Sequence, residues 1–296
     1  MSEPLFYGAA TALVTPFRGN RIDFDALERL IDRQIDGGID ALVVLGTTGE
    51  PASVTPPERS AIIECAAARV GRRVPLIVGA GSNDTRAAVA LAREAEQLGA
   101  DALLVVTPYY NKTSERGLIE HFNAVADSVE LPVILYDVPS RTGMTLPPRV
   151  VEELARHPNL CAVKAASGDM RQLAELAERC GGGVAVYSGC DDLVLPALAL
   201  GARGVISVLG NLAPRAMHEL VSQWLRGEVK RSREIQLEYL PLARALSHPV
   251  NPIPVKAVLA MMGLCEETLR LPLAPLDAGE REALARVLKR YGLVEG

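Results

Sequence analysis

The sequence predicts an α/β fold, a (β/α)₈ barrel followed by a small C-terminal helical domain. Short apolar segments rich in Val, Leu and Ile alternate eight times with longer amphipathic segments, as expected for parallel strands that are buried on both faces and joined by helices. The first apolar segment runs into Thr15-Pro16-Phe17 rather than into the Gly-rich nucleotide loop of many open doubly wound sheets. After about residue 226 the strand pattern disappears and only helical segments remain.

The eight expected strands are short and nearly continuous in aliphatic residues. They are residues 9–15, 39–45, 74–79, 101–107, 132–138, 160–166, 184–188 and 203–209. Eight parallel strands joined by right-handed crossovers close most economically as a TIM barrel. An open doubly wound sheet is the alternative, although it usually has fewer strands.

A helix is expected after each strand, and several of these helices have clear start or stop signals. Asp84 precedes an Ala-rich run, prolines 56 and 57 occupy a first turn, and Gly71 and Gly99 follow helix ends. The eight helices are expected at 24–37, 56–70, 84–98, 115–128, 147–156, 170–179, 192–199 and 214–226.

The C-terminal part contains three further helical segments, at 229–246, 254–263 and 279–291. Turns containing Pro and Gly separate them, and no low-complexity linker precedes them. We therefore predict a catalytic barrel over residues 1–226 and a C-terminal helical domain over 227–296 that packs on the barrel.

Composition excludes several classes of protein. The formal charge of −5 and the absence of a basic stripe argue against a nucleic-acid partner. No apolar run approaches the roughly 18 residues of a membrane span, and the first residues do not resemble a signal peptide. Five cysteines without C-x-x-C spacing are typical of free thiols in the cytoplasm. The four histidines do not have the spacing of a zinc site, so no metal is expected.

Lys164 is the strongest candidate for catalysis among the five lysines. It lies in the predicted strand at 160–166, where alternation places Ala162 and Ala166 on the same face. Two small neighbours leave room for a long side chain inside a packed barrel, near the end of a strand where barrels place their active sites. Burial favours the neutral amine, which can attack a carbonyl. The alternative is a structural lysine paired with Asp137 or Asp169.

Tyr136 and Arg141 follow one another in the segment YDVPSRTG at the end of the fifth strand. Tyr136 is expected to face the same mouth as Lys164, and a phenol can donate and accept a proton in turn. Arg141 could hold a substrate carboxylate in a bidentate contact. Tyr136 could instead be a core residue with its hydroxyl at the rim, and Arg141 could form a surface salt bridge.

Two loops add polar groups to the same mouth. The second strand ends in a turn that contains Thr47 and Thr48 between glycines, which could bind a carboxylate and relay protons. The fourth strand is followed by Tyr109-Tyr110, and paired tyrosines are common at interfaces. Neither loop is specific by itself.

Seven segments together resemble the dihydrodipicolinate synthase/N-acetylneuraminate lyase family of pyruvate aldolases. They are GAATALVTPF, GTTGE, VTPYYNK, YDVPSRTG, VKAASGD, GARGVISV and NPIPVK. The resemblance covers nearly the whole chain, and Leu271-Pro272-Leu273 is similar to the helical tail of the synthases. Arg141, which the lyases usually lack, and Thr47, where they usually have Ser, indicate the synthase branch.

The resemblance implies a class I aldolase in which Lys164 forms a covalent Schiff base with the substrate pyruvate and no cofactor is needed. It implies a proton relay through Tyr136, Thr47 and Tyr110. Tyr110 would come from a neighbouring subunit, which implies a homotetramer built as a dimer of dimers.

The resemblance also implies the substrate contacts. Thr48 would bind the pyruvate carboxylate, the backbone carbonyl of Ile206 would border the pyruvate site, and Arg141 would bind the acceptor, L-aspartate-4-semialdehyde. The product would be 4-hydroxy-tetrahydrodipicolinate, which enters lysine and diaminopimelate synthesis.

Three residues depart from the pattern of the family: Asp137 stands where Asn is usual, Ala165 where Glu is common and Cys190 where an acid is common. These departures keep a sister aldolase that acts on a sugar-derived 2-keto acid open as an alternative. A non-catalytic barrel that serves as a binding protein is a second alternative. A phosphate-binding isomerase is a third, because fold alone does not fix function.

The resemblance finally implies weak or absent feedback inhibition by L-lysine. Relatives that respond to lysine have a histidine and a glutamate at the positions of Arg59 and Ala87. Tyr109 and Asn83 of that site are present. We expect Arg59 to repel the cationic effector and Ala87 to remove the carboxylate that pairs with its ammonium group, unless another acid such as Asp84 takes over.

Overall fold

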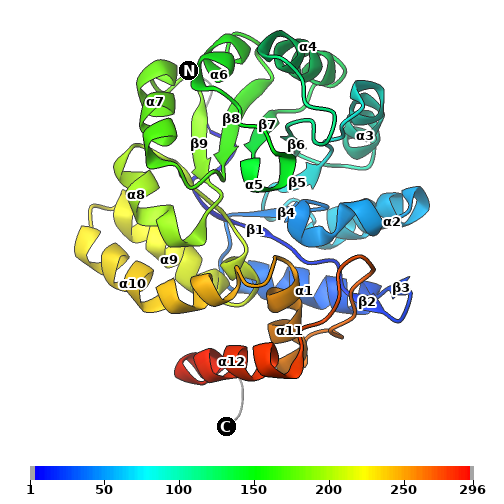
Figure 1. The fold of residues 1–296 in the computed structure, drawn as a ribbon, viewed down its shortest axis with the longest axis vertical. Coiled ribbons are helices and arrows are strands. Elements are labelled where there is room, and N and C mark those ends of the chain that lie inside the picture. Colours follow the sequence, from blue (N-terminus) through cyan, green and yellow to red (C-terminus); the bar gives the residue numbers. More distant parts are fainter. Residues whose placement is uncertain (1–3, 294–296) are drawn as a thin grey trace.

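Eight parallel strands form a closed barrel in a computed structural model that describes residues 4–293 (Figure 1). The strand order is β1-β10-β9-β8-β7-β6-β5-β4, so the predicted (β/α)₈ fold class is confirmed. The strands are β1 (Gly8–Ala12), β4 (Ala41–Val44), β5 (Leu76–Gly79), β6 (Ala102–Val106), β7 (Val133–Asp137), β8 (Leu160–Ala165), β9 (Ala185–Ser188) and β10 (Gly204–Ser207).

A helix follows each barrel strand, as the alternation predicted, and the helices surround the barrel (Figure 1). They are α1 (Phe24–Asp36), α2 (Pro56–Val70), α3 (Thr85–Gln97), α4 (Glu115–Ala126), α6 (Pro148–Leu154), α7 (Met170–Cys180), α8 (Val194–Ala199) and α9 (Pro214–Leu225). The sequence placed their ends within about two residues, which is the ordinary uncertainty of helix boundaries.

The first strand is shorter than predicted, since it ends at Ala12 rather than at residue 15. The N–H of Val14 donates to the side-chain oxygen of Asn211 at 3.1 Å, so the chain leaves the ladder there. Several short elements were not predicted from the sequence, because they contain too few residues to show a helical or strand period. These are the hairpin of β2 (Phe17–Arg18) and β3 (Arg21–Ile22), the helix α5 (Pro139–Thr142), and the 3₁₀ turns η1 (Thr47–Gly49), η2 (Pro51–Ser53), η3 (Asp191–Leu193) and η4 (Leu209–Asn211).

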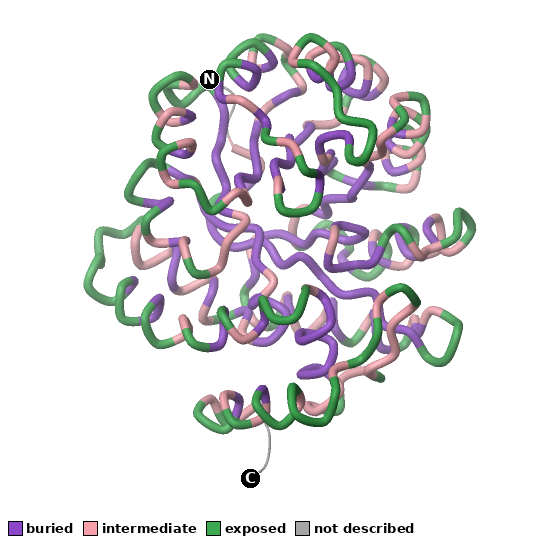
Figure 2. The backbone as a smooth tube through the Cα atoms, in the orientation of Figure 1, coloured by how far each residue is buried: buried purple, intermediate pink, exposed green. Residues whose placement is uncertain are grey.

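Two apolar cores hold the barrel together, one between strands and helices and one inside the barrel. The strands run buried through the centre while the outer faces of the helices are exposed (Figure 2). The inner core combines alanines such as Ala162 and Ala185 with two tyrosines, Tyr136 and Tyr187. Tyr187 stacks on Phe6 with ring centroids 4.3 Å apart and donates to the Phe6 carbonyl at 2.7 Å.

The C-terminal helices are α10 (Val229–Ala245), α11 (Ile253–Met261) and α12 (Ala278–Leu288), and η5 (Lys289–Tyr291) follows. Figure 1 shows α12 below α11 at the bottom of the view, and α12 contacts both α10 and α11. The helix α10 packs along α9, and the Ser232 hydroxyl donates to the Leu220 carbonyl at 2.7 Å. The predicted division at residue 226 stays a prediction. None of the helices within residues 4–293 is long and apolar enough to cross a membrane.

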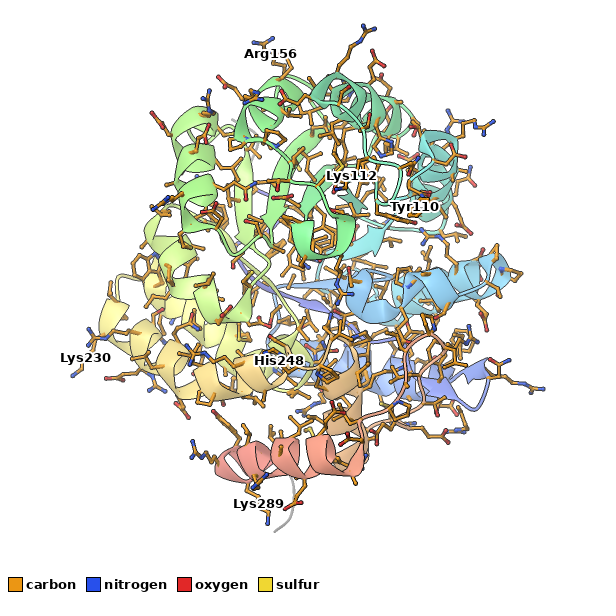
Figure 3. All side chains as sticks on the ribbon, viewed as in Figure 1. Tyr110, Lys112, Arg156, Lys230, His248 and Lys289 are labelled. Carbon is orange, nitrogen blue, oxygen red and sulfur yellow. The ribbon has the colours of Figure 1, made fainter. Side chains whose placement is uncertain are left out.

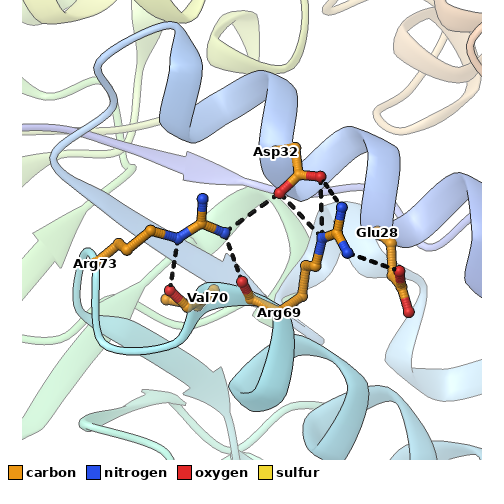
Figure 4. A network of polar contacts seen from close by, with 5 residues as sticks. All are labelled: Glu28, Asp32, Arg69, Val70 and Arg73. Carbon is orange, nitrogen blue, oxygen red and sulfur yellow. Dashed lines mark hydrogen bonds and ion pairs between the residues drawn. The ribbon is translucent and has the colours of Figure 1, made fainter.

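An ion-pair network joins α1 to α2 on the surface (Figure 4). The Arg69 Nε and the Arg73 Nη2 donate to the Asp32 carboxylate at 3.0 and 3.3 Å, and Arg69 also contacts Glu28 at 3.2 Å. The hydrogen bond from Arg69 lowers the pKa of Asp32 below its ordinary value. These groups are partly exposed, so the network contributes little stability.

Candidate active site

Lys164 points into the barrel beside Tyr136. It lies on β8 opposite Tyr136 of β7, the residue is 5% exposed, and its Nζ lies 4.4 Å from the centre of the Tyr136 ring. Gly189 keeps this space open, since a Cβ there would lie 3.1 Å from the Lys164 Cε and 2.5 Å from the Ala166 Cβ. The prediction that Lys164 and Tyr136 face the same mouth is confirmed.

The two acids considered as structural partners of Lys164 are engaged elsewhere. Asp137 accepts hydrogen bonds from the Leu146 N–H at 2.9 Å and the Gln172 side-chain amide at 2.8 Å. Burial raises the pKa of Asp137. Asp169 caps α7 by accepting from the Arg171 N–H at 2.8 Å. Within residues 4–293 no carboxylate lies within ion-pair distance of Lys164, so the alternative of a salt-bridged structural lysine is wrong.

Thr47 comes to Tyr136 through a strained turn. The backbone of Leu45 has φ 55°, a left-handed conformation that is unfavourable for leucine. Gly79 on β5 accommodates it, because a Cβ there would lie 2.1 Å from the Leu45 carbonyl oxygen. The turn η1 then places the Thr47 hydroxyl 3.5 Å from the Tyr136 hydroxyl. Either hydroxyl can donate, which a proton relay requires.

Thr48 and Arg141 are linked by a residue that the sequence analysis did not single out, Asn251. The Asn251 side-chain amide donates to the Thr48 hydroxyl oxygen at 3.0 Å, and the Arg141 guanidinium donates to the Asn251 carbonyl at 2.6 Å. The Thr48 hydroxyl therefore keeps its own proton for donation to a carboxylate. Arg141 is exposed, and no salt bridge to it is found among the described residues, so the alternative of a surface ion pair is wrong. Asn251 is the first residue of the NPIPVK segment, whose family resemblance was the one feature of the sequence that pointed to it.

Ile206 and Tyr110 lie at very different depths. Ile206 is fully buried on β10 and pairs with Ala10. Tyr110 is 93% exposed on the loop after β6 and has φ 69°. Figure 3 shows Tyr110 beside α3, away from the barrel centre. Within the described chain Tyr110 therefore does not join Tyr136 and Thr47.

The three residues that depart from the family pattern, Asp137, Ala165 and Cys190, are not among the predicted catalytic or substrate-binding residues. Asp137 bonds to the outer layer through Gln172. Ala165 and Cys190 are neighbours, because both line one small, partly open pocket of about 10 Å³ beside Ser167. A pocket of that size scarcely holds one water molecule, which needs about 10–15 Å³. Burial raises the pKa of the Cys190 thiol to about 11, so it is neutral near pH 7.

Arg59 has a partner that the sequence did not suggest. Its Nε donates to the Glu94 carboxylate at 2.9 Å, and the Ser60 hydroxyl donates to the same group at 2.5 Å. Asp84, the acid considered as a substitute, instead caps α3 through the Arg86 N–H at 3.0 Å. The charge of Arg59 is therefore largely neutralised, and the expected repulsion of a cation must be weaker than the sequence implied.

Known proteins of one family match this chain over its length. A model of the dihydrodipicolinate synthetase family matches residues 5–291. The 4-hydroxy-tetrahydrodipicolinate synthase of Acetivibrio thermocellus is 47% identical over 294 residues, which are 99% of this chain and 100% of the relative. The dihydrodipicolinate synthase structure from Thermotoga maritima is 40% identical with a TM-score of 0.96, covering 98% of this chain and 100% of that one. The pyruvate complex of the Acinetobacter baumannii synthase is 39% identical with a TM-score of 0.95, covering 97% and 99%.

Proposed function

Because the chain belongs to the dihydrodipicolinate synthetase family, we propose that its barrel mouth carries out the reaction of the 4-hydroxy-tetrahydrodipicolinate synthases. The chain is a pyruvate-dependent class I lyase. The single observation that carries the mechanism is the buried Lys164, which has no carboxylate within ion-pair distance among the described residues and lies against Tyr136. Pyruvate is the first substrate, and L-aspartate-4-semialdehyde is the acceptor.

The reaction begins with attack of the neutral Lys164 amine on the keto carbon of pyruvate. The resulting carbinolamine loses water to give an imine, and loss of a methyl proton gives the nucleophilic enamine. Each step moves a proton, and we assign the delivery and removal of that proton to the Tyr136 hydroxyl. Thr47, 3.5 Å from Tyr136, extends the path toward solvent.

The carboxylates of the two substrates are assigned to two sides of the mouth. Thr48 binds the pyruvate carboxylate through its hydroxyl, and the Ile206 carbonyl borders that site. Arg141 binds the carboxylate of the semialdehyde, and Asn251 joins the two subsites through its contacts with Thr48 and Arg141.

Carbon–carbon bond formation then links the substrates. The enamine carbon attacks the aldehyde, whose oxygen takes up a proton and becomes the 4-hydroxyl group. The amine of the former semialdehyde adds to the imine carbon and displaces the Lys164 amine, which closes the ring and regenerates the enzyme. The product is 4-hydroxy-tetrahydrodipicolinate.

We further propose that the active unit is a homotetramer, a dimer of dimers, in which Tyr110 completes the relay of a neighbouring subunit. Two observations support this: Tyr110 is 93% exposed, and it holds a left-handed backbone with φ 69° that is unfavourable for tyrosine. Closed two-fold symmetry would make the exchange reciprocal. We place the reaction in the cytoplasm, which agrees with five cysteines that form no disulfide.

A panel of acceptors tests the substrate assignment. Purified enzyme is incubated with pyruvate and either L-aspartate-4-semialdehyde or an aldose such as N-acetylmannosamine, and the products are identified by mass spectrometry. We expect pyruvate to condense efficiently with the semialdehyde and not with the aldose. Preference for the sugar would support the alternative of a sister aldolase, and condensation with neither would support a non-catalytic barrel.

A further inference from the structure

Lys256 is a fully buried lysine that the mechanism does not use. It lies on α11, far along the chain from the barrel strands, and its side chain is 0% exposed. Its Nζ donates to the Glu50 carboxylate at 2.6 Å and to the Thr268 carbonyl at 2.8 Å. The same nitrogen lies 4.1 Å from the centre of the Phe17 ring. Two hydrogen bonds and one aromatic ring thus hold the ammonium group in place.

Glu50 occupies the last position of the turn that contains Thr47 and Thr48. Its backbone is left-handed, with φ 53° and ψ 45°, which is unfavourable for a residue with a Cβ. Its N–H donates to the Thr47 carbonyl at 3.2 Å. Its side chain is 1% exposed and also accepts from the Arg270 N–H at 3.4 Å. The turn is therefore anchored at its end by the Glu50 carboxylate.

A buried ion pair is a costly way to fill this space. Removing two charges from water costs several kcal/mol per ion, and well-packed apolar residues often serve stability as well or better. Burial lowers the pKa of Lys256, and the neighbouring Glu50 carboxylate opposes that change. Stability alone therefore does not account for the pair, whereas a short charge-assisted hydrogen bond fixes two segments relative to each other.

We propose that Glu50 and Lys256 are positioning residues of the active site. By holding the end of the turn against α11, they place the Thr47 hydroxyl at Tyr136 and the Thr48 hydroxyl at the pyruvate carboxylate. The C-terminal helices are then part of the catalytic apparatus and not only a cover for the barrel. This inference rests on the proposed function, since it assigns these two threonines to the relay and to the pyruvate site.

Two variants separate positioning from stability. Glu50→Gln leaves an uncompensated ammonium group in the core and is expected to be less stable. The double variant Glu50→Gln/Lys256→Met removes both charges and is expected to regain most of that stability, because breaking a buried pair costs more than replacing it. Steady-state kinetics over a pyruvate titration and the midpoint of urea unfolding are measured for both variants and for the wild type.

We expect kcat/KM for pyruvate to fall on the order of 10²-fold in both variants, as displacement of catalytic groups by about 1 Å commonly does. KM should rise because Thr48 moves, and kcat should fall because Thr47 moves. The decisive result is a double variant that regains stability without regaining kcat/KM. A double variant within threefold of wild-type kcat/KM would overturn the inference, because the pair would then be only structural.

A matched control is Asp40→Asn at the opposite end of the barrel. Asp40 precedes β4, accepts from the Ala9 N–H at 2.8 Å and contacts the His218 Nδ1 at 2.9 Å. This change should alter the unfolding midpoint and leave the pyruvate KM unchanged. Wild-type enzyme that forms no imine with pyruvate would refute the proposed function, whereas active wild type with unaffected variants would refute only the positioning role.

Discussion

Arg270 joins the C-terminal segment to the helix that follows the catalytic turn, and its removal should destabilise the protein in a pH-dependent way. Its two terminal nitrogens contact the Glu58 carboxylate at 2.5 and 2.7 Å. It also donates to the carbonyls of Ser53 and Asn20 at 2.7 and 2.9 Å. The hydrogen bonds from Arg270 are the largest cause that lowers the pKa of Glu58 to about 2.

The size of the effect follows from that pKa. A fall from the ordinary value of 4.5 to about 2 corresponds to at most about 3.4 kcal/mol, at about 1.36 kcal/mol per pH unit. Thr55 supplies part of the lowering, and the Glu58 side chain is 24% exposed, so we assign about 1–2 kcal/mol to Arg270. A lowered carboxyl pKa stabilises the fold above pH 4.5, and this stabilisation is lost as the pH falls toward 2.

Urea unfolding of wild type and Arg270→Met at pH 7 and pH 2.5 measures this contribution. The difference in unfolding free energy should be largest at pH 7 and should narrow at pH 2.5 by about 0.4–1.2 kcal/mol, because the folded-state pKa of Glu58 is about 2 in the wild type. Loss of the contacts with Ser53 and Asn20 should leave a remainder that does not depend on pH. Arg149→Met is the control, because Arg149 pairs with Glu115 on the exposed surface, where an ion pair contributes little to the free energy of unfolding. A difference that is equal at both pH values would refute the role given to Glu58.

Three further predictions concern the site and its assembly. Arg141→Ala should lower kcat/KM for the semialdehyde on the order of 10²-fold, while borohydride still traps the pyruvate imine; equal loss of both steps would contradict the acceptor role. Hybrids of inactive Tyr110→Phe and inactive Lys164→Ala subunits should regain part of the activity, whereas a fully active monomer would rule out exchange between subunits. L-lysine at up to tens of millimolar should inhibit the enzyme only weakly, because Ala87 supplies no carboxylate for the ammonium group of the effector. Glu94 neutralises the charge of Arg59, so repulsion by Arg59 adds little to this expectation. Half-inhibition below 1 mM L-lysine would show that the effector site is intact.

Local patterns were sufficient to predict the barrel and the placement of its central lysine. Alternation along a strand places Lys164 inside, and the end of a neighbouring strand brings Tyr136 to it. Both inferences need only the period of a β-strand and the order of the strands. The same reasoning gave the helix positions, because their amphipathic period is long enough to recognise.

Contacts between distant segments could not be predicted in this way. Asn251 reaches Thr48 across 203 positions, and Lys256 reaches Glu50 across 206. The sequence did not distinguish Lys256 from the other lysines of the C-terminal part. Helical periodicity shows which face of a helix is buried, but it does not show which strand end a side chain on that face contacts. Tyr110 illustrates a different limit, because its proposed partner lies on another subunit.

Trapping of the pyruvate imine tests the central claim most directly. The enzyme is incubated with pyruvate and sodium borohydride, its intact mass is measured, and the modified residue is identified by peptide mapping. We predict one reduced pyruvate adduct per chain, located on Lys164, and none in Lys164→Ala. An adduct on another lysine, or one that persists in Lys164→Ala, would contradict the assignment.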